Sequence, residues 1–203
     1  MPMEILNYKQ KELEEILKTV TNIEEGKIKV IAVMGKSGAG KDYIMKQMLA
    51  MWPDLHEIVS CTTRAPRSNE RDGVDYHFLT VEDFIQQAKE RKFIEWNVFN
   101  NWYYGTRISD LDASATNIGV FNPRGVRALL ADSRLDVQVF YVIADARTRL
   151  LRQLERDVNV DVNEVVRRYG TDEEDFADLD SIPYMIIENN GKVNPIKSFK
   201  NER

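Results

Sequence analysis

The sequence predicts a three-layer α/β fold in which a parallel β-sheet lies between helices. An apolar run at 29–34, of the kind that forms a strand buried on both faces, passes through a glycine-rich loop into a segment able to form a helix at 43–49. Further apolar runs at 118–122, 137–143 and 184–189 are separated by segments with helical spacing. Buried strands that alternate with helices are typical of this fold class.

Composition favours a single compact domain and excludes several other classes of protein. The chain has 203 residues, of which 43% are hydrophobic and 30% charged, so it can bury a sizeable core. A net charge of −5 does not fit a general nucleic-acid binder, which usually has a basic excess. No apolar run approaches the roughly 20 residues needed to cross a bilayer. We therefore expect neither a nucleic-acid partner nor a membrane partner.

Cysteine content and the first residues bear on location. Cys61 is the single cysteine, so an internal disulfide is excluded and a reducing compartment fits best. Residues 1–5 do not show a basic region followed by an apolar one, as a signal peptide would. These observations predict a cytoplasmic protein.

Residues 1–26 form a separate N-terminal segment ahead of a domain that spans 27–203. Apolar residues recur at helical spacing from 4 to 25 while Lys and Glu fill the other faces, which predicts an amphipathic helix. Gly26 ends this helix. Its apolar face fits packing on the protein's own core and, as an alternative, a homodimer contact.

The glycine-rich loop has the spacing of a phosphate-binding P-loop. Its glycines let successive backbone N–H groups curl around an anion, and the helix that follows adds its positive end. Lys41 places a positive charge where the β- and γ-phosphates of a nucleotide would lie. A structural turn alone would not need Gly35, Gly40 and Lys41 at this spacing. The predicted ATP-binding residues of the loop are Gly35, Ser37, Gly38, Ala39, Gly40, Lys41 and Asp42.

Asp42 departs from the usual P-loop pattern, in which Ser or Thr follows the lysine and binds Mg²⁺ through its hydroxyl. A carboxylate can bind a hard cation itself, so Asp42 is the candidate ligand for the Mg²⁺ that accompanies ATP. The same carboxylate could instead repel the triphosphate. The sequence leaves both interpretations open.

A polar loop at 60–78 carries three arginines and several hydroxyl groups. Arg64 and Arg67 flank Pro66, which stiffens the turn, so their guanidinium groups could converge on one phosphate. An arginine-bearing surface loop is also common in proteins. Taken alone, this loop does not decide between the two interpretations.

Glu95 lies in an apolar, strand-like run at 93–96, ahead of an expected turn at 100–106. A lone glutamate in such a run is usually solvated or salt-bridged. A semi-buried carboxylate is also suited to accept paired N–H donors from a base.

Six arginines lie in or near a helix that Asp145 is expected to cap. Arginines at helical spacing most often form a solvated face paired with nearby acids. Alternatively, such arginines close over phosphates as a mobile lid during phosphoryl transfer. They are Arg147, Arg149, Arg152, Arg156, Arg167 and Arg168.

These stretches, in this order after a P-loop, resemble the guanylate kinases over residues 28–190. The nucleoside monophosphate site of that family combines Ser-x-Thr-Thr-Arg-x-Pro-Arg, Gly-x-Asp-Tyr-x-Phe, a Glu in Phe-Ile-Glu, and Tyr-Tyr-Gly-Ser. Here these motifs correspond to residues 60–67, 73–78, 93–95 and 103–106, with Thr in place of the last Ser. Several independent motifs in the right order are far more specific than a P-loop alone.

The resemblance implies a substrate site as well as an architecture. A P-loop core would carry a nucleoside-monophosphate-binding insertion at about 60–113 and a lid at about 146–170. Glu95 would accept hydrogen bonds from N1–H and the 2-amino group of guanine, and adenine lacks both donors. The implied phosphate-binding residues are Arg64, Arg67, Tyr76 and Tyr104, and the implied guanine-binding residues are Ser60, Glu95 and Thr106.

The resemblance also implies residues that act on ATP and on the transferred phosphate. Asn189 falls where the family contacts the ATP nucleoside. Arg156 and Arg168 correspond to the lid arginines, and Arg152 is an alternative to Arg156 because the alignment through 152–163 is loose. The implied catalytic residues are Lys41, Arg64, Arg67, Arg156 and Arg168.

The implied function is transfer of the ATP γ-phosphate to GMP or dGMP, with Mg²⁺ as cofactor. Two acids of the family are replaced here by Val120 and Asn122 while Asp42 is gained, and we hypothesise that metal binding or base contact has relocated. One alternative is a broader deoxynucleoside monophosphate kinase on the same scaffold. The other is a non-catalytic guanylate-kinase-like module that binds a phosphopeptide, against which the retained Lys41 argues.

Overall fold

The computed structural model describes residues 26–190 apart from 68, 100 and 156–159. The expected N-terminal helix, residues 1–25, lies outside this part of the chain. The main sheet has five parallel strands in the order β2-β7-β1-β8-β9. No helix among the described residues is long and apolar enough to span a membrane. The strands are β1 Ile28–Met34, β2 Leu55–Glu57, β7 Thr116–Val120, β8 Leu135–Ile143 and β9 Met185–Glu188.

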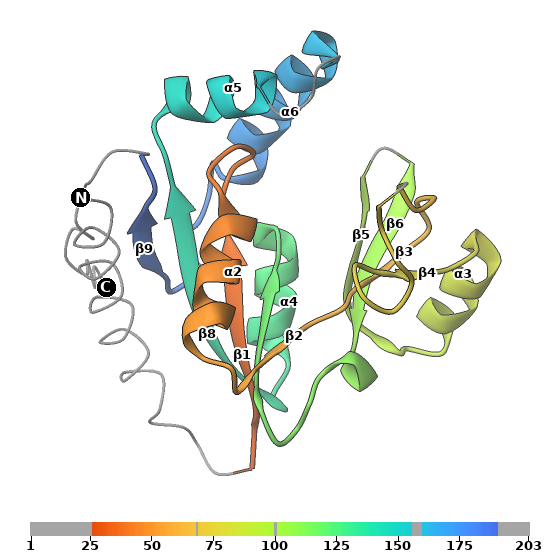
Figure 1. The fold of residues 1–203 in the computed structure, drawn as a ribbon. Coiled ribbons are helices and arrows are strands. Elements are labelled where there is room, and N and C mark those ends of the chain that lie inside the picture. Colours follow the sequence, from red (N-terminus) through yellow and green to blue (C-terminus); the bar gives the residue numbers. More distant parts are fainter. Residues whose placement is uncertain (1–25, 68, 100, 156–159, 191–203) are drawn as a thin grey trace.

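Side chains of β1 alternate between the two faces of this sheet and define three layers. Ile31 and Val33 belong to a core cluster with helix α2 (Lys41–Met51), whereas Val30, Ala32 and Met34 belong to a cluster with helix α4 (Pro123–Ala131). The central strand is therefore buried on both faces, between the two helices (Figure 1). The predicted three-layer α/β class with a parallel sheet is confirmed.

A second sheet of four strands, in the order β4-β3-β6-β5, lies to one side of the main sheet (Figure 1). Residues 102–106, expected to belong to a turn, instead lie in β6, which pairs antiparallel with β5. Aromatic side chains suit a pleated, half-buried strand, so the actual turn is shorter than expected. The elements are β3 Cys61–Thr62, β4 His77–Phe78, α3 Val81–Lys89, β5 Phe93–Phe99, β6 Trp102–Arg107 and the 3₁₀ helix η1 Ile108–Asp110.

The carboxyl ends of the parallel strands meet at one edge of the main sheet, where polar residues gather. Asn122, after β7, accepts a hydrogen bond from Gly125 N–H at 2.8 Å and so caps α4. Asp145, after β8, caps helix α5 (Ala146–Leu154) by accepting from Thr148 N–H at 2.9 Å. Helices α5 and α6 (Val162–Asp175) lie above this edge, next to the P-loop (Figure 1).

Candidate active site

The loop between β1 and α2 has the backbone geometry of an anion-binding loop. Gly38 and Gly40 have φ values of +77° and +90°, in the left-handed region that favours glycine. A Cβ atom on Gly38 would lie 2.3 Å from the carbonyl oxygen of Arg149, and one on Gly40 would lie 2.3 Å from Nδ2 of Asn189. Both the backbone conformation and the close packing therefore require glycine at these positions.

Arg152 and Asn189 brace this loop from α5 and from the end of β9. The Arg152 guanidinium donates to the carbonyl oxygens of Gly38 at 3.2 Å, Ala39 at 3.3 Å and Asn189 at 2.8 Å. The buried Asn189 amide donates to the Ala39 carbonyl at 2.9 Å. These contacts satisfy loop carbonyl groups and not the N–H groups that a phosphate would need. Asn189, expected to contact the ATP nucleoside, thus lies against the loop backbone.

Lys41 stands at the start of α2 and turns its amine back over the loop. Its Nζ donates to the Gly35 carbonyl at 2.7 Å. Burial lowers the pKa of Lys41, while the nearby carboxylates of Asp42 and Asp172 act in the opposite direction. Among the residues that the structure describes, the acceptor of this amine is a neutral carbonyl, so the positive charge is available to a phosphate.

Asp42 is exposed in the first turn of α2. Among the described residues its carboxylate accepts no hydrogen bond. The same part of the chain contains no cluster of three or more His, Cys, Asp or Glu side chains that could hold a metal ion. Mg²⁺ is commonly held by one or two carboxylates together with substrate phosphates, and a single free carboxylate beside the P-loop fits that mode.

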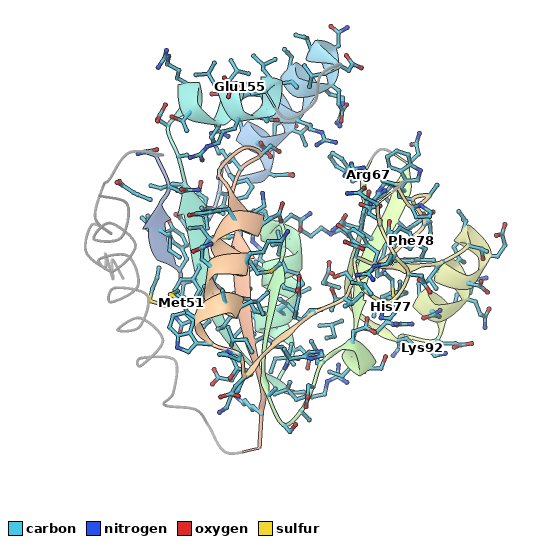
Figure 2. The ribbon with its side chains drawn as sticks, in the orientation of Figure 1. Met51, Arg67, His77, Phe78, Lys92 and Glu155 are labelled. Atoms are coloured by element: carbon cyan, nitrogen blue, oxygen red, sulfur yellow. The ribbon has the colours of Figure 1, made fainter. Side chains whose placement is uncertain are left out.

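The predicted phosphate-binding arginines face a carboxylate of their own loop. Arg64, 9% exposed, donates to both oxygens of Glu70 at 2.9 Å. Arg67 is more exposed, and its NH1 lies 3.8 Å from Glu70 Oε1. The hydrogen bonds from Arg64 lower the pKa of Glu70, so this carboxyl group is ionised at neutral pH. Figure 2 shows Arg67 at the end of the second sheet that lies nearest helices α5 and α6.

Tyr76 and Tyr104 adjoin this pair of arginines. Their ring centroids are 6.1 Å apart, edge to face, and the Arg64 guanidinium carbon lies 5.5 Å from the centre of the Tyr76 ring. The structure thus brings together Arg64, Tyr76 and Tyr104, which come from different stretches of the sequence.

Two of the predicted base-reading residues, Glu95 and Thr106, lie two cross-strand pairs away from Tyr104. Glu95 of β5 is opposite Thr106 of β6, and Asn97 is opposite Tyr104. Ser60 Oγ and Thr106 Oγ1 are 3.1 Å apart, within hydrogen-bond distance. Burial raises the pKa of Glu95 to about 7, although hydrogen bonding by Thr106 and the charge of Arg124 oppose the shift. Glu95 is therefore a carboxyl group poised to change its charge near neutral pH.

A single cavity of about 340 Å³ connects the P-loop with the second sheet. It opens between the P-loop side of the main sheet, the hairpin β5–β6 and helix α6. Asn97 and Phe99 of β5 and Asp172 of α6 also line it. The predicted site residues that line it are Gly35, Lys41, Ser60, Tyr76, Glu95 and Tyr104.

Of the two predicted lid arginines, the structure describes Arg168. Arg156 lies outside the described residues. Arg168, in α6, donates to Glu164 at 2.7 Å, and its guanidinium carbon lies 5.3 Å from the centre of the Phe99 ring. This contact joins α6 to Phe99 of β5, a residue that lines the cavity.

The expectation of a solvated arginine face holds for Arg147 and is wrong for Arg149. Arg147 is exposed, whereas Arg149 is 4% exposed and lies beneath α6. Leu150 and Leu151 of the same helix are more exposed than Arg149, at 37% and 39%. The reason is that α6 places two carboxylates, Asp172 and Glu173, beside the arginine.

Val120 and Asn122, where the sequence departs from the guanylate kinase pattern, both line the cavity. Asn122 uses its side chain to cap α4, and Val120 presents an apolar surface. No carboxylate replaces the two missing acids at this strand end. Besides Glu95 of β5, the acids that line the cavity are Asp172 and Asp175 of α6.

Sequence reasoning did not identify Glu70 or Asp172 as site residues, and it named Arg149 only as one of six arginines that could form a lid. Glu70 could have been suspected, because it is the acid between three arginines of one loop. Asp172 and Arg149 give no comparable signal, since only the packing of α6 on α5 and the P-loop brings them together.

The fold and the cavity define a P-loop nucleoside monophosphate kinase. Lys41 of the P-loop and Tyr76 and Tyr104 of the second sheet line the same cavity, the arrangement expected for phosphoryl transfer between two nucleotides. Comparison with known proteins agrees with this class. Residues 27–197 match the family model for guanylate kinase.

Similar proteins carry the same name. The guanylate kinase of Rubrobacter xylanophilus is 32% identical over 163 residues, 78% of this chain and 85% of that protein. The guanylate kinase of Mycoplasma genitalium is 28% identical over 192 residues, 91% of this chain and 79% of that protein. The match to the Schizosaccharomyces pombe guanylate kinase, 48% identical over 83 residues, covers 40% of this chain and 41% of that protein.

A solved structure supports the fold. The crystal structure of guanylate kinase from Anaplasma phagocytophilum aligns with a TM-score of 0.57 at 21% identity, covering 80% of this chain and 78% of that one. The chain belongs to the guanylate kinase family, the ATP-dependent phosphotransferases that act on GMP.

Proposed function

We propose that this chain transfers the γ-phosphate of ATP to GMP or dGMP, giving ADP and the nucleoside diphosphate. The observation that carries this proposal is the shared cavity, with Lys41 at its P-loop side and Glu95 and Tyr104 on the opposite wall. A cavity that reaches both phosphate sites allows direct transfer between two bound nucleotides. The retained Lys41 and the family match favour this activity over a non-catalytic phosphopeptide-binding module.

Catalysis in such a transfer rests on position and charge, and no protein nucleophile is needed. Lys41 would neutralise the β- and γ-phosphates. Arg64 and Arg67 would exchange Glu70 for the acceptor phosphate, and Tyr76 and Tyr104 would fix its place. The lid arginines, Arg156 and Arg168, would close over the transferred group and exclude water.

The choice of guanine would rest on Glu95. Its ionised carboxylate can accept from N1–H and the 2-amino group together, and Ser60 and Thr106 supply hydroxyl groups beside it. Adenine would leave this buried carboxylate without donors, which is unfavourable. None of these contacts reads the 2′ position of the sugar, so both GMP and dGMP belong to the proposal.

The direct test is a coupled assay of ADP release with ATP, Mg²⁺ and eight acceptors: GMP, dGMP, AMP, dAMP, CMP, dCMP, UMP and dTMP. We expect activity with GMP, dGMP or both, and at least about a hundredfold lower kcat/KM with the other acceptors. Comparable activity with several deoxynucleotides would support the broader kinase instead. No turnover with any acceptor, in folded protein, would reject the proposal.

The raised pKa of Glu95 predicts that GMP binding depends on pH. Because the carboxylate form is the acceptor, protonation below about pH 7 should weaken binding, and GMP should bind roughly tenfold less tightly at pH 6 than at pH 8. Calorimetric titration with GMP across this range measures the effect. The phosphate of GMP also titrates in this pH range, so Glu95→Gln serves as the control. This variant should lose the part of the pH dependence of GMP affinity that is due to Glu95. An identical pH profile in both proteins would show that Glu95 does not titrate on binding.

Mg²⁺ is the metal we propose, with Asp42 as its protein ligand. When bound with ATP it would neutralise phosphate charge. Support comes from the exposed Asp42 carboxylate one residue after Lys41, which accepts no hydrogen bond from the described part of the chain. Phosphate oxygens of ATP would supply further ligands of Mg²⁺ that do not come from the protein.

Removing the Asp42 carboxylate should raise the Mg²⁺ concentration needed for half-maximal rate. We expect at least about a tenfold increase for Asp42→Ala, since a unit charge touching a cation near a protein surface is worth more than about 1.4 kcal/mol. Asp42→Ser, which restores a hydroxyl ligand, should give a smaller increase. The control is Asp54→Ala, which removes one exposed negative charge beyond the far end of α2. An unchanged Mg²⁺ requirement in Asp42→Ala would exclude Asp42 as a ligand.

The proposal also includes location and assembly. A cytoplasmic location is supported by the lone, buried Cys61. A homodimer through residues 4–25 remains a proposal based on the apolar spacing of that segment, and neither nucleic acid nor membrane is proposed as a partner.

A further inference from the structure

A carboxylate from α6 lies on the P-loop. Asp172 Oδ2 accepts from the Ser37 backbone N–H at 2.6 Å, and Oδ1 accepts from the Ser37 hydroxyl at 3.2 Å. The N–H groups of a P-loop are the donors that bind nucleotide phosphates. An anionic side chain therefore takes one of these donors.

Arg149 approaches the same carboxylate without bonding to it. Its NH1 atom is 3.8 Å from Asp172 Oδ2, which is too long for a hydrogen bond. NH1 is buried and has no hydrogen-bond partner among the described residues. Arg149 is 4% exposed, so water does not easily replace the missing acceptor.

The rest of the Arg149 side chain is held in place. NH2 donates to Glu173 Oε1 at 3.1 Å, and the guanidinium carbon lies 4.8 Å from the centre of the Tyr169 ring. The Glu173 carboxylate also pairs with Lys36 of the P-loop. The unpartnered NH1 is thus a donor held at a fixed position, 3.8 Å from the Asp172 carboxylate that accepts from Ser37.

Distance, and not a lack of acceptor sites, leaves this donor unpaired. A carboxylate has about four lone-pair sites and Ser37 uses two of them, but Asp172 Oδ2 lies 3.8 Å from NH1. A terminal phosphate has three free oxygens around a tetrahedral centre, so one oxygen could accept from Ser37 while another accepts from Arg149. A buried charged donor without an acceptor is costly, and a phosphate would remove that cost.

We propose that Arg149 is a further ATP-phosphate-binding residue, and that Asp172 occupies the place of the phosphate when ATP is absent. ATP would displace Asp172 from Ser37 and bring a phosphate oxygen to NH1 of Arg149. The electrostatic influence of Arg149 and Asp172 on Lys41 agrees with their closeness to the P-loop lysine. This inference rests on the proposed binding of ATP to the P-loop.

The test is calorimetric titration of the full chain and its variants with ATP and Mg²⁺, and separately with GMP. Arg149→Gln should weaken ATP binding roughly ten- to hundredfold, the range of a lost hydrogen bond to a charged group, and Arg149→Lys should fall in between. Asp172→Asn should tighten ATP binding by about tenfold, because the competing charge is removed. GMP affinity should stay within twofold in all three, which also reports correct folding.

Arg147→Gln is the matched control, since it removes an exposed arginine from the same helix and should leave both affinities unchanged. ATP affinity within twofold of the parent in Arg149→Gln, or weakened ATP binding in Asp172→Asn, would overturn the inference. If Arg149→Gln does not fold, the ATP affinities of Arg149→Lys and Asp172→Asn test the inference in its place. A parent protein that does not bind ATP would instead overturn the proposed function, and the inference with it.

Discussion

Replacing Lys41 with alanine is expected to reduce kcat with ATP and GMP by roughly 10³- to 10⁵-fold, the range for loss of a cation that stabilises phosphoryl transfer. Within residues 26–190, as far as the structure describes them, the Lys41 amine bonds to the Gly35 carbonyl and to no anion. Its loss removes charge where the transferred phosphate would lie. Single-turnover measurement with saturating ATP and GMP separates this effect from weakened binding.

Folding of the Lys41→Ala variant should be nearly unaffected. The change removes one hydrogen bond, worth about 1 kcal/mol, and relieves the desolvation that lowers the pKa of this lysine. Lys46→Ala provides the control, because Lys46 is exposed on the same helix and carries the same charge. Thermal melting should be similar for both variants. A Lys41→Ala enzyme that keeps more than a tenth of the parental kcat would contradict the P-loop interpretation.

Replacing Glu95 with glutamine should lower kcat/KM for GMP by roughly 10²- to 10⁴-fold, approaching the penalty seen when a site built for hydrogen bonding loses its match. The side chain is 8% exposed and pairs across the hairpin with the position of Thr106, so the new amide stays in place. Its NH₂ group would then meet the N–H donors of guanine. The measurement is kcat/KM for GMP, dGMP and AMP at one pH above 7.

A smaller preference for GMP over AMP is the distinguishing result for Glu95→Gln. If kcat/KM fell equally for every acceptor, Glu95 would have a structural role and not a base-reading one. Glu82→Gln is a suitable control, since this exposed glutamate lies in the same part of the fold and should change neither value. Glutamine has nearly the same shape as glutamate, so Glu95→Gln should change the packing around position 95 very little.

Features encoded in contiguous residues were predictable from the sequence. The P-loop depends on glycines that the backbone requires at 38 and 40, and its strand and helix are recognisable beside it. Glu95 stands out because it is a charge within an apolar run. The predicted roles of Arg64, Arg67, Tyr76 and Tyr104 depended on the family resemblance, since the polar loop alone allowed a surface interpretation.

Features created by tertiary packing were not predictable. The arginine spacing in α5 favoured a solvated face, whereas the carboxylates of α6 draw Arg149 inward and leave Leu150 and Leu151 more exposed. Nothing local in the sequence reports which acid will lie opposite a given arginine. The extent of β6 was likewise set by its pairing with β5, which outweighed the asparagines of the expected turn.

The ion pair between Arg64 and Glu70 has a consequence for how the protein matures. Two arginines beside a half-enclosed site would repel each other in a newly made chain that has not yet met a nucleotide. Glu70 offsets one of the two charges from within the same loop, which lowers that repulsion before any substrate is present. The proposed binding of a monophosphate would then exchange one counter-ion for another, and its affinity should depend less on salt concentration than that of a site with bare arginines.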